Sequence, residues 1–229
     1  MMKLAFLGSY LALAAAAGCG GSVVDNTGGT GGTGGTGGGA QACSAFRDEQ
    51  GNSAVTLHLR NETTMPIFVQ GDCLGEAIYR LVNLGNNDPD TTFPFDPACL
   101  QTCEGLQTQP QFACGACAPA VVRIEPGATH DVVWDGTGLR SGLTMPSLCW
   151  FESQSGGTCS KVVAAPAGTW TATVRAFSEC GDNCMCDASG NCFGDAQGLE
   201  ASATSTPFVY PTADGVDVVF EVCAFGCAD

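Results

Sequence analysis

The feature that most constrains the fold is a series of short segments in which apolar and polar residues alternate. The clearest is residues 168–177 (GTWTATVRAF), which are rich in β-branched and aromatic side chains. Residues 55–60 and 215–222 alternate in the same way. Because successive side chains of a strand point to opposite faces, these segments predict strands with one buried face.

Further segments and turns extend this pattern along the chain. Residues 66–70, 120–124 and 131–134 also predict strands, and residues 76–82 fit either a strand or a short helix. Some seven short strands without a convincing helical period predict an all-β fold, an antiparallel β-sandwich. The residues expected to face its core are Val55, Leu57, Leu59, Trp170, Ala172 and Val174.

Two turns are predicted beside these strands. Glu125-Pro126-Gly127 combines a proline, which presets its own φ, with a glycine that accepts a positive φ. Asp135-Gly136 is a second turn signal directly after the segment that ends in Trp134.

Three segments together form a recognisable set of turn and strand motifs. They are residues 59–67 with Asn61 between two strands, residues 124–136 with Pro-Gly and Trp-Asp-Gly, and residues 166–171 with Pro-Ala-Gly-Thr-Trp. This combination resembles the immunoglobulin-like domains of the bacterial intracellular proteinase inhibitor family. The resemblance implies an Ig-like β-sandwich, and proteinase inhibition as an alternative function. The chain departs from that family in its export signal and its many cysteines.

The first 18 residues have the pattern of a signal peptide. Lys3 is followed by an apolar run over residues 4–17, shorter than the roughly 20 residues of a spanning helix. Ala16-Ala17-Gly18-Cys19 resembles the lipoprotein signal of bacteria, although Ala16 replaces the usual large aliphatic residue. That resemblance implies that Cys19 becomes the first mature residue and carries lipid; ordinary secretion with cleavage is the alternative. Gly20, where the inner-membrane retention signal has Asp, implies an outer-membrane location.

A glycine-rich segment separates this leader from the rest of the chain. Eleven of the 23 residues from Gly20 to Ala42 are glycine, and threonine recurs at every third position from Thr27 to Thr36. Without proline the repeat does not predict a collagen helix, so residues 19–42 are expected to be the lipidated cysteine and a flexible linker. Residues 43–229 are expected to form one disulfide-rich β-sandwich domain.

Cysteine is the second strong constraint. The chain has 15 cysteines, and setting Cys19 aside leaves an even number, 14, which suits complete pairing in an exported protein. The 14 are Cys99, Cys103, Cys114 and Cys117; Cys149 and Cys159; Cys180, Cys184, Cys186 and Cys192; and Cys43, Cys73, Cys223 and Cys227. We expect disulfides largely within these groups, with Cys43 and Cys73 joined to Cys223 and Cys227. A zinc site in the first group is the alternative.

The net charge of −15 excludes one class of partner. Nucleic-acid binding needs clusters of Lys and Arg, and the chain has only 8 such residues against 23 Asp and Glu. We therefore expect no nucleic-acid partner. The partners expected are the lipid bilayer, through the anchor, and an envelope protein or polysaccharide.

Candidate catalytic and metal-binding residues are few. The two histidines are His58, on the polar parity of its strand, and His130, which shares parity with Trp134; no Gly-x-Ser-x-Gly elbow accompanies them. Soft ligands for copper would come from His130, Met65, Met145 and Met185. The residues Asp187, Ser189, Asn191 and Asp195 alternate like the start of a calcium loop, but Cys192 and Gly198 occupy its glycine and glutamate positions.

These observations predict no enzyme and no cofactor. The function expected is a non-enzymatic binding or structural module, held at the cell envelope by a lipid and recognising its partner through the stapled inserts 99–117 and 180–192. Proteinase inhibition and periplasmic copper carriage remain alternatives. Protection of the domain from proteases is an alternative purpose for the disulfides.

Overall fold

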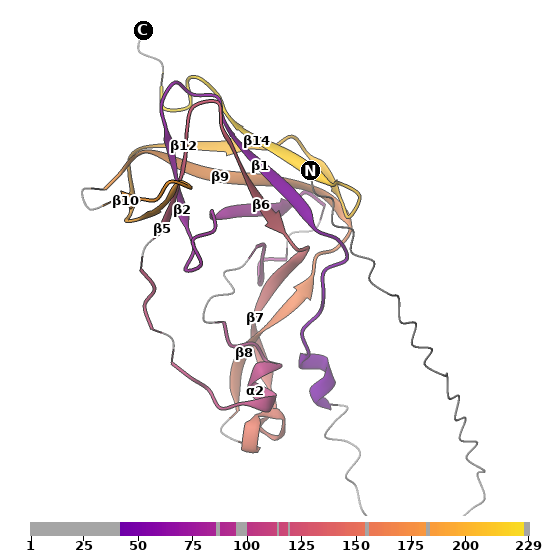
Figure 1. Cartoon of the computed structure of the whole chain (residues 1–229). Coiled ribbons are helices and arrows are strands. Elements are labelled where there is room, and N and C mark those ends of the chain that lie inside the picture. Colours follow the sequence, from indigo (N-terminus) through magenta and orange to yellow (C-terminus); the bar gives the residue numbers. More distant parts are fainter. Residues whose placement is uncertain are drawn as a thin grey trace, which may run out of the picture. The chain divides into compact units, whose positions relative to one another are not determined.

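The structure is a computed structural model, and it describes residues 42–85, 88–94, 100–113, 115–118, 120–153, 156–181 and 184–226. The predicted signal peptide, Cys19 and nearly all of the linker lie outside these residues, as do Cys99, Cys114 and Cys227. The part of the chain that is described is predominantly β-structure (Figure 1).

The described residues form fourteen strands and four short helical segments. In chain order the strands are β1 (Val55–Asn61), β2 (Ile67–Gly71), β3 (Tyr79–Asn83), β4 (Thr91–Thr92), β5 (Ala120–Ile124), β6 (Thr129–Trp134), β7 (Thr137–Met145), β8 (Gly157–Ala164), β9 (Gly168–Cys180), β10 (Met185–Cys186), β11 (Asn191–Phe193), β12 (Ala196–Thr204), β13 (Phe208–Tyr210) and β14 (Gly215–Phe220). The helical segments are η1 (Ser44–Phe46), α2 (Gly105–Thr108), η2 (Ser147–Cys149) and η3 (Phe151–Ser153).

Two sheets pack face to face in a sandwich, as predicted. The first sheet has the order β14-β1-β6. The second has the order β10-β11-β5-β2-β9-β12, with β3 and β13 also paired to β9. The strand pairs are antiparallel, except that β1 lies parallel to β14 (Figure 1). The last described strand therefore lies beside the first.

The core between the two sheets is built from the parities that the sequence predicts. Val55, Leu57 and Leu59 of β1 are fully buried, and so are the alternate residues Trp170, Ala172 and Val174 of β9. At one end of the core the aromatic rings gather, with ring centroids 5.4 Å apart for Trp134 and Trp170, and 4.9 Å apart for Trp134 and Tyr210. These rings join the two sheets, because Trp134 lies on β6 and Trp170 on β9.

Both predicted turns are present. Gly127 has φ +74°, and the Ala128 amide donates to the carbonyl of Glu125 at 3.0 Å, which closes the turn before β6. Gly136 has φ +78°, and a Cβ there would overlap the Tyr210 hydroxyl, so only glycine fits at the end of β6. The segment 76–82, which left strand and helix open, contains the start of strand β3.

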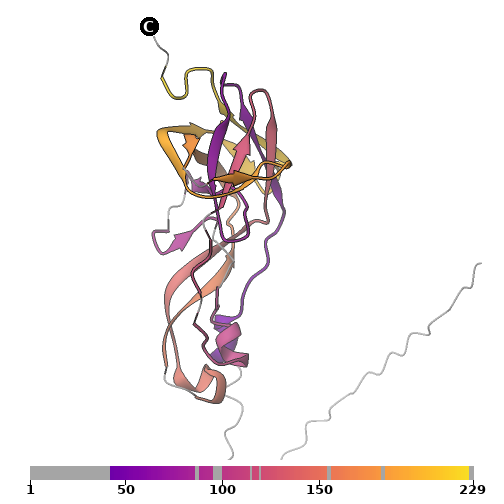
Figure 2. The same cartoon turned by 60° about the vertical axis from the view of Figure 1, so that its left-hand side comes forward.

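A long hairpin of β7 and β8 extends away from the sandwich (Figures 1 and 2). The alternation of apolar and polar residues in the sequence does not predict this hairpin. At its far end η1 and α2 cover a second, small apolar cluster of Cys103, Leu106, Met145, Cys149, Trp150 and Cys159. In the part of the chain that is described, no helix has the length and apolar character to cross a bilayer.

Candidate binding groove beside strand β6

The described residues contain a groove of about 640 Å³ beside strand β6, which we call the β6 groove. One wall consists of residues 131–137, which include the end of β6. The other wall consists of residues 72–79, the connection between β2 and β3. The two walls are more than 50 residues apart in sequence and are brought together only by the fold.

The connection between β2 and β3 is a short, stiff hairpin. Gly71 bridges Ala77, and the Ile78 amide donates to the Gln70 carbonyl at 2.8 Å. At the tip, Oδ1 of Asp72 accepts hydrogen bonds from the amides of Leu74 (2.8 Å) and Glu76 (2.9 Å). This Asx-type arrangement fixes the loop that forms the wall of the groove.

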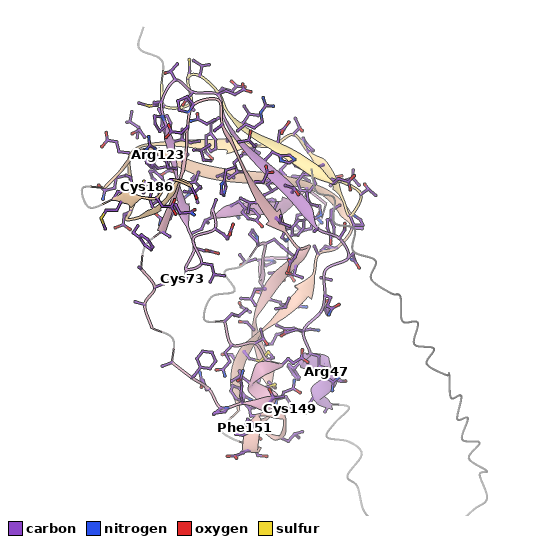
Figure 3. The ribbon with its side chains drawn as sticks, viewed as in Figure 1. Arg47, Cys73, Arg123, Cys149, Phe151 and Cys186 are labelled. Atoms are coloured by element: carbon purple, nitrogen blue, oxygen red, sulfur yellow. A yellow bond between two sulfur atoms is a disulfide. The ribbon has the colours of Figure 1, made fainter. Side chains whose placement is uncertain are left out.

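A disulfide also fixes this loop, by linking it to the segment before β5. Cys73 is bonded to Cys117, which lies just before β5 (Figure 3). The pairing has a simple cause: β2 pairs antiparallel with β5, and Gly71 lies opposite Ala120. Two residues beyond β2 and three before β5, the chain therefore brings the two cysteines together.

The groove exposes apolar side chains. Leu74 (67% exposed), Ile78 (49% exposed) and Val133 (62% exposed) all line it. Beneath them lie the buried side chains of Ala77 and Trp134. A cluster of exposed apolar residues over a packed base is typical of a recognition surface rather than of an ordinary loop.

The polar lining of the groove is acidic. Asp72, Glu76, Asp131 and Asp135 line it, and no Lys or Arg is found among its described lining residues. Asp72 and Asp135 each use Oδ1 to hold their own turns, Asp135 by accepting from the amide and hydroxyl of Thr137. Their Oδ2 atoms have no hydrogen-bond partner among the described residues.

Tyr79 shows the same electrostatic character. Burial of its phenol, together with the carboxylates of Asp135, Asp72 and Glu76, raises the pKa of Tyr79 well above its usual value. The hydroxyl remains protonated at neutral pH. An environment that opposes a further negative charge favours a positive one, so the groove suits a cationic ligand that also has apolar surface.

A second exposed surface lies on the insert 180–193. β10 pairs with β11, Cys186 is bonded to Cys192 directly across the pair, and Cys180 is bonded to Cys184 (Figure 3). Opposite each other on the same hairpin are Met185 and Phe193, both largely exposed. The two disulfides staple this insert as predicted, whereas its exposed apolar side chains were not predicted.

Of the five disulfides whose two cysteines both belong to the described residues, three differ from the predicted groups. Cys180–Cys184 and Cys186–Cys192 lie within one group, as predicted. Cys43–Cys149, Cys73–Cys117 and Cys103–Cys159 join different groups. The expectation that Cys43 and Cys73 pair with Cys223 and Cys227 is wrong. Cys223 is itself disulfide-bonded.

The reason is the unpredicted hairpin β7–β8. Cys149 and Cys159 lie at its far end, where η1 brings Cys43 to one side and α2 brings Cys103 to another (Figure 3). The Cys103 amide donates to the carbonyl of Ser160 at 2.7 Å, so the chain is held beside β8 at the position of the bond. With Cys103 and Cys117 both oxidised, the first group has no four thiolates for zinc.

One group of metal-ligand atoms does converge among the described residues. The sulfur atoms of Cys184, Cys186 and Cys192 lie within 4.8 Å of one another. All three are in disulfides, so none is a thiolate that could bind a metal. The residues of the calcium-loop pattern form a turn instead, in which Oδ1 of Asp187 accepts from the amides of Ser189 (2.8 Å) and Asn191 (3.0 Å).

The histidine and methionine candidates lie on separate elements. His58 Nδ1 lies 2.7 Å from Oδ1 of Asp131 on the outer face of the first sheet, and no hydroxyl or thiol of the described residues hydrogen-bonds to its ring. His130 is on β6 and Met185 on β10. Met145 is buried in the small cluster, and Met65 lies in the turn after β1. The fold does not assemble the four proposed copper ligands into one described site.

The sequence alone does not predict the groove. A local signal was present, because Asp72-Cys73-Leu74-Gly75-Glu76 combines an Asx residue, a glycine and a cysteine between two apolar runs. Nothing local, however, indicates that this loop lies opposite β6. The chain matches no protein-family model, no curated protein and no solved structure.

Proposed function

We propose that this protein is a lipid-anchored, exported binding module of a bacterial cell envelope, and that the β6 groove holds its ligand. The observation that carries the proposal is the groove itself, where exposed Leu74, Ile78 and Val133 lie beside four carboxylates and no Lys or Arg is among the described lining residues. Of these carboxylates, only Asp131 is hydrogen-bonded to a histidine of the described chain, His58. The ligand is cationic and partly apolar. It is bound and released unchanged.

Rigidity supports this proposal. The groove walls are a disulfide-linked hairpin and a strand packed on the core, so binding orders little of the protein. Less conformational entropy is then lost in the complex than with flexible loops. The leader and linker supply the second half of the proposal, since a glycine-rich tether beyond Cys19 would hold such a domain clear of the lipid headgroups.

The test replaces one groove residue by lysine. Leu74→Lys places a cation on the acidic wall and should abolish capture of the partners that the wild-type protein recovers from intact envelopes. The matched control is Leu199→Lys on β12, because Leu199 is 62% exposed against 67% for Leu74 and lies outside the groove. Capture should be unchanged in the control. Equal capture by both variants would overturn the groove as the binding site.

A further inference from the structure

Strand β6 has an unpaired edge. It is an outer strand of the sheet β14-β1-β6, and no strand of the described residues pairs with its other side. On the other side of β1, the amides of Thr56 and Glu62 donate to Asp214 and Phe220, at and beyond the ends of β14. The backbone amides and carbonyls of successive residues point to opposite sides of a strand. Those of the even-numbered residues of β1 therefore point toward β14, and those of the odd-numbered residues point toward β6.

The register then identifies the free groups on β6. Leu57 lies opposite Val132 and Leu59 opposite His130, and the Asn61 amide donates to the Ala128 carbonyl at 3.0 Å. The even-numbered residues of β6 are therefore bonded to β1. The amides and carbonyls of Thr129, Asp131 and Val133 point outward, and the last two of these residues line the β6 groove.

An edge of this kind is a template for another strand. The six residues of β6 span about 20 Å, which accommodates a short extended peptide. Such a peptide would lie with its backbone along β6 and its side chains toward the walls of the groove. Asp131 and Val133 share the exposed face of β6, and Val132 and Trp134 share its buried face. Every second side chain of the peptide would therefore lie on the face of Asp131 and Val133, and the intervening ones on the face of Val132 and Trp134, which also line the groove.

The charge of the edge determines which strand it can accept. A second copy of this chain would bring Asp131 of each β6 close to the other, and the whole chain carries a net charge of −15. Like charges across a strand pair are destabilising, so self-pairing is disfavoured. An extended segment with Lys or Arg alternating with aliphatic residues complements both faces of the edge, with its basic side chains on the face of Asp131 and its aliphatic ones on the face of Val132 and Trp134.

We propose that an extended, basic segment of a partner protein adds to the β6 edge as a further strand of the first sheet, with its Lys or Arg side chains against the carboxylates of the groove. This inference rests on the proposed function and names the class of ligand. The backbone pairing supplies affinity, and the alternation of basic and aliphatic side chains supplies selectivity.

The test is amide hydrogen exchange, measured by NMR on the full chain with its disulfides intact. The probe is an acetylated, amidated pentapeptide of alternating valine and lysine. On binding, the amides of Thr129, Asp131 and Val133 should exchange at least about tenfold more slowly. The amides of His130, Val132 and Trp134, already bonded to β1, serve as internal controls and should change little.

Two further probes separate backbone pairing from charge alone. The same peptide with N-methylated amides keeps its charge and apolar surface but loses its donors, and should bind at least about tenfold more weakly. A glutamate-for-lysine peptide should not bind. On the protein side, Val133→Pro removes one outward amide at a position where an edge strand tolerates proline, and should weaken the valine–lysine peptide to a similar extent.

Equal affinity for the parent and N-methylated peptides, or no added protection on β6, would overturn strand addition. So would the absence of any binding by the valine–lysine peptide. These results would leave the proposed function standing as long as Leu74→Lys still loses the envelope partners. Retention of those partners by Leu74→Lys would instead defeat the proposed function, so the two failures are distinguishable.

Discussion

Asn61 shows how a single buried amide can hold a corner of the sandwich. Its side chain is fully buried at the end of β1. Nδ2 donates to the carbonyls of Met65 and Ile124, both at 2.9 Å, while Oδ1 accepts from the amide and the hydroxyl of Thr63. All of its hydrogen-bonding capacity is used inside the protein. The glycosylation pattern Asn61-Glu62-Thr63 therefore has no accessible acceptor nitrogen in the folded domain.

Asn61→Ala should lower the free energy of unfolding by about 3 kcal/mol, since it removes four hydrogen bonds at a buried site and leaves the Thr63 amide without its acceptor. Chemical denaturation followed by tryptophan fluorescence measures the change. The control is Asn52→Ala, at an exposed position, which should change stability by less than about 0.5 kcal/mol. A loss below about 1 kcal/mol in Asn61→Ala would show that water replaces the amide and that the corner does not depend on it.

At the level of elements, what could be predicted from sequence follows from how local each signal is. β1, β2, β5, β6, β9 and β14 were predicted because one face of each packs on the core, and this leaves an alternation in the sequence. β12 and the hairpin β7–β8 were not predicted, because β7 buries residues only at its ends, β12 only near its C-terminal end, and β8 only at Cys159. A strand without a continuously buried face shows no regular alternation of apolar and polar residues in its sequence.

The same argument explains the disulfides and the groove. Cys186 and Cys192 pair across one short hairpin, so proximity in sequence is sufficient to predict the bond. Cys73 and Cys117 meet only because β2 pairs with β5, and the walls of the β6 groove meet only through both sheets. Contacts of this kind depend on which strands pair in the fold, and a single sequence does not show that pairing.

The far end of hairpin β7–β8 should depend on its disulfides. Its apolar cluster has only six buried residues, too few to hold η1 and α2 in place by burial alone. The bond Cys103–Cys159 closes a loop of 56 residues, which by chain entropy is worth about 4 kcal/mol. The double variant Cys103→Ala, Cys159→Ala should therefore lose amide protection around α2 and the hairpin end, measured by hydrogen exchange.

In that variant the sandwich should keep its protection, because its core is separate from the small cluster. The double variant Cys186→Ala, Cys192→Ala is the matched comparison and should loosen only the β10–β11 hairpin. Collapse of protection across β1 and β9 in the Cys103 and Cys159 variant would contradict this division into two separately stabilised parts.

At the scale of the whole molecule, the negative charge of the domain opposes its approach to an anionic membrane, whereas the predicted lipid anchor would hold it there. Beyond the predicted leader, which contains Lys3, 7 basic residues remain against 23 acidic ones, a net charge of −16. A domain so acidic is repelled by anionic headgroups, so in the proposed arrangement attachment would come from the lipid on Cys19 and separation from the linker. If the 23 residues after Cys19 form the flexible linker that the sequence predicts, random-coil scaling gives them a reach of about 25 Å.

Cys19→Ser should release the protein from the membrane fraction or leave its precursor uncleaved, because the lipid has no other attachment point in the predicted signal. Fractionation and incorporation of labelled fatty acid measure this. Ser22→Ala, a neighbouring change in the linker, should leave the protein membrane-bound and in the outer-membrane fraction. Absence of label from the wild-type protein would contradict lipid anchoring, and recovery with the inner membrane would contradict the expected sorting.

The parallel pairing of β1 with β14 also sets an order of events as the chain emerges. β1 is the central strand of the first sheet, with Leu57 opposite Val132 on one side and Val216 on the other. A chain that emerges from its N-terminus can form the β6 side early, but the β14 side must wait until nearly all of the described domain has been delivered. Until then the sheet lacks Val216, Val218 and Phe220, three of the buried residues that close the core. An interrupted chain is thus left with an open hydrophobic interior, and only a complete one can seal it.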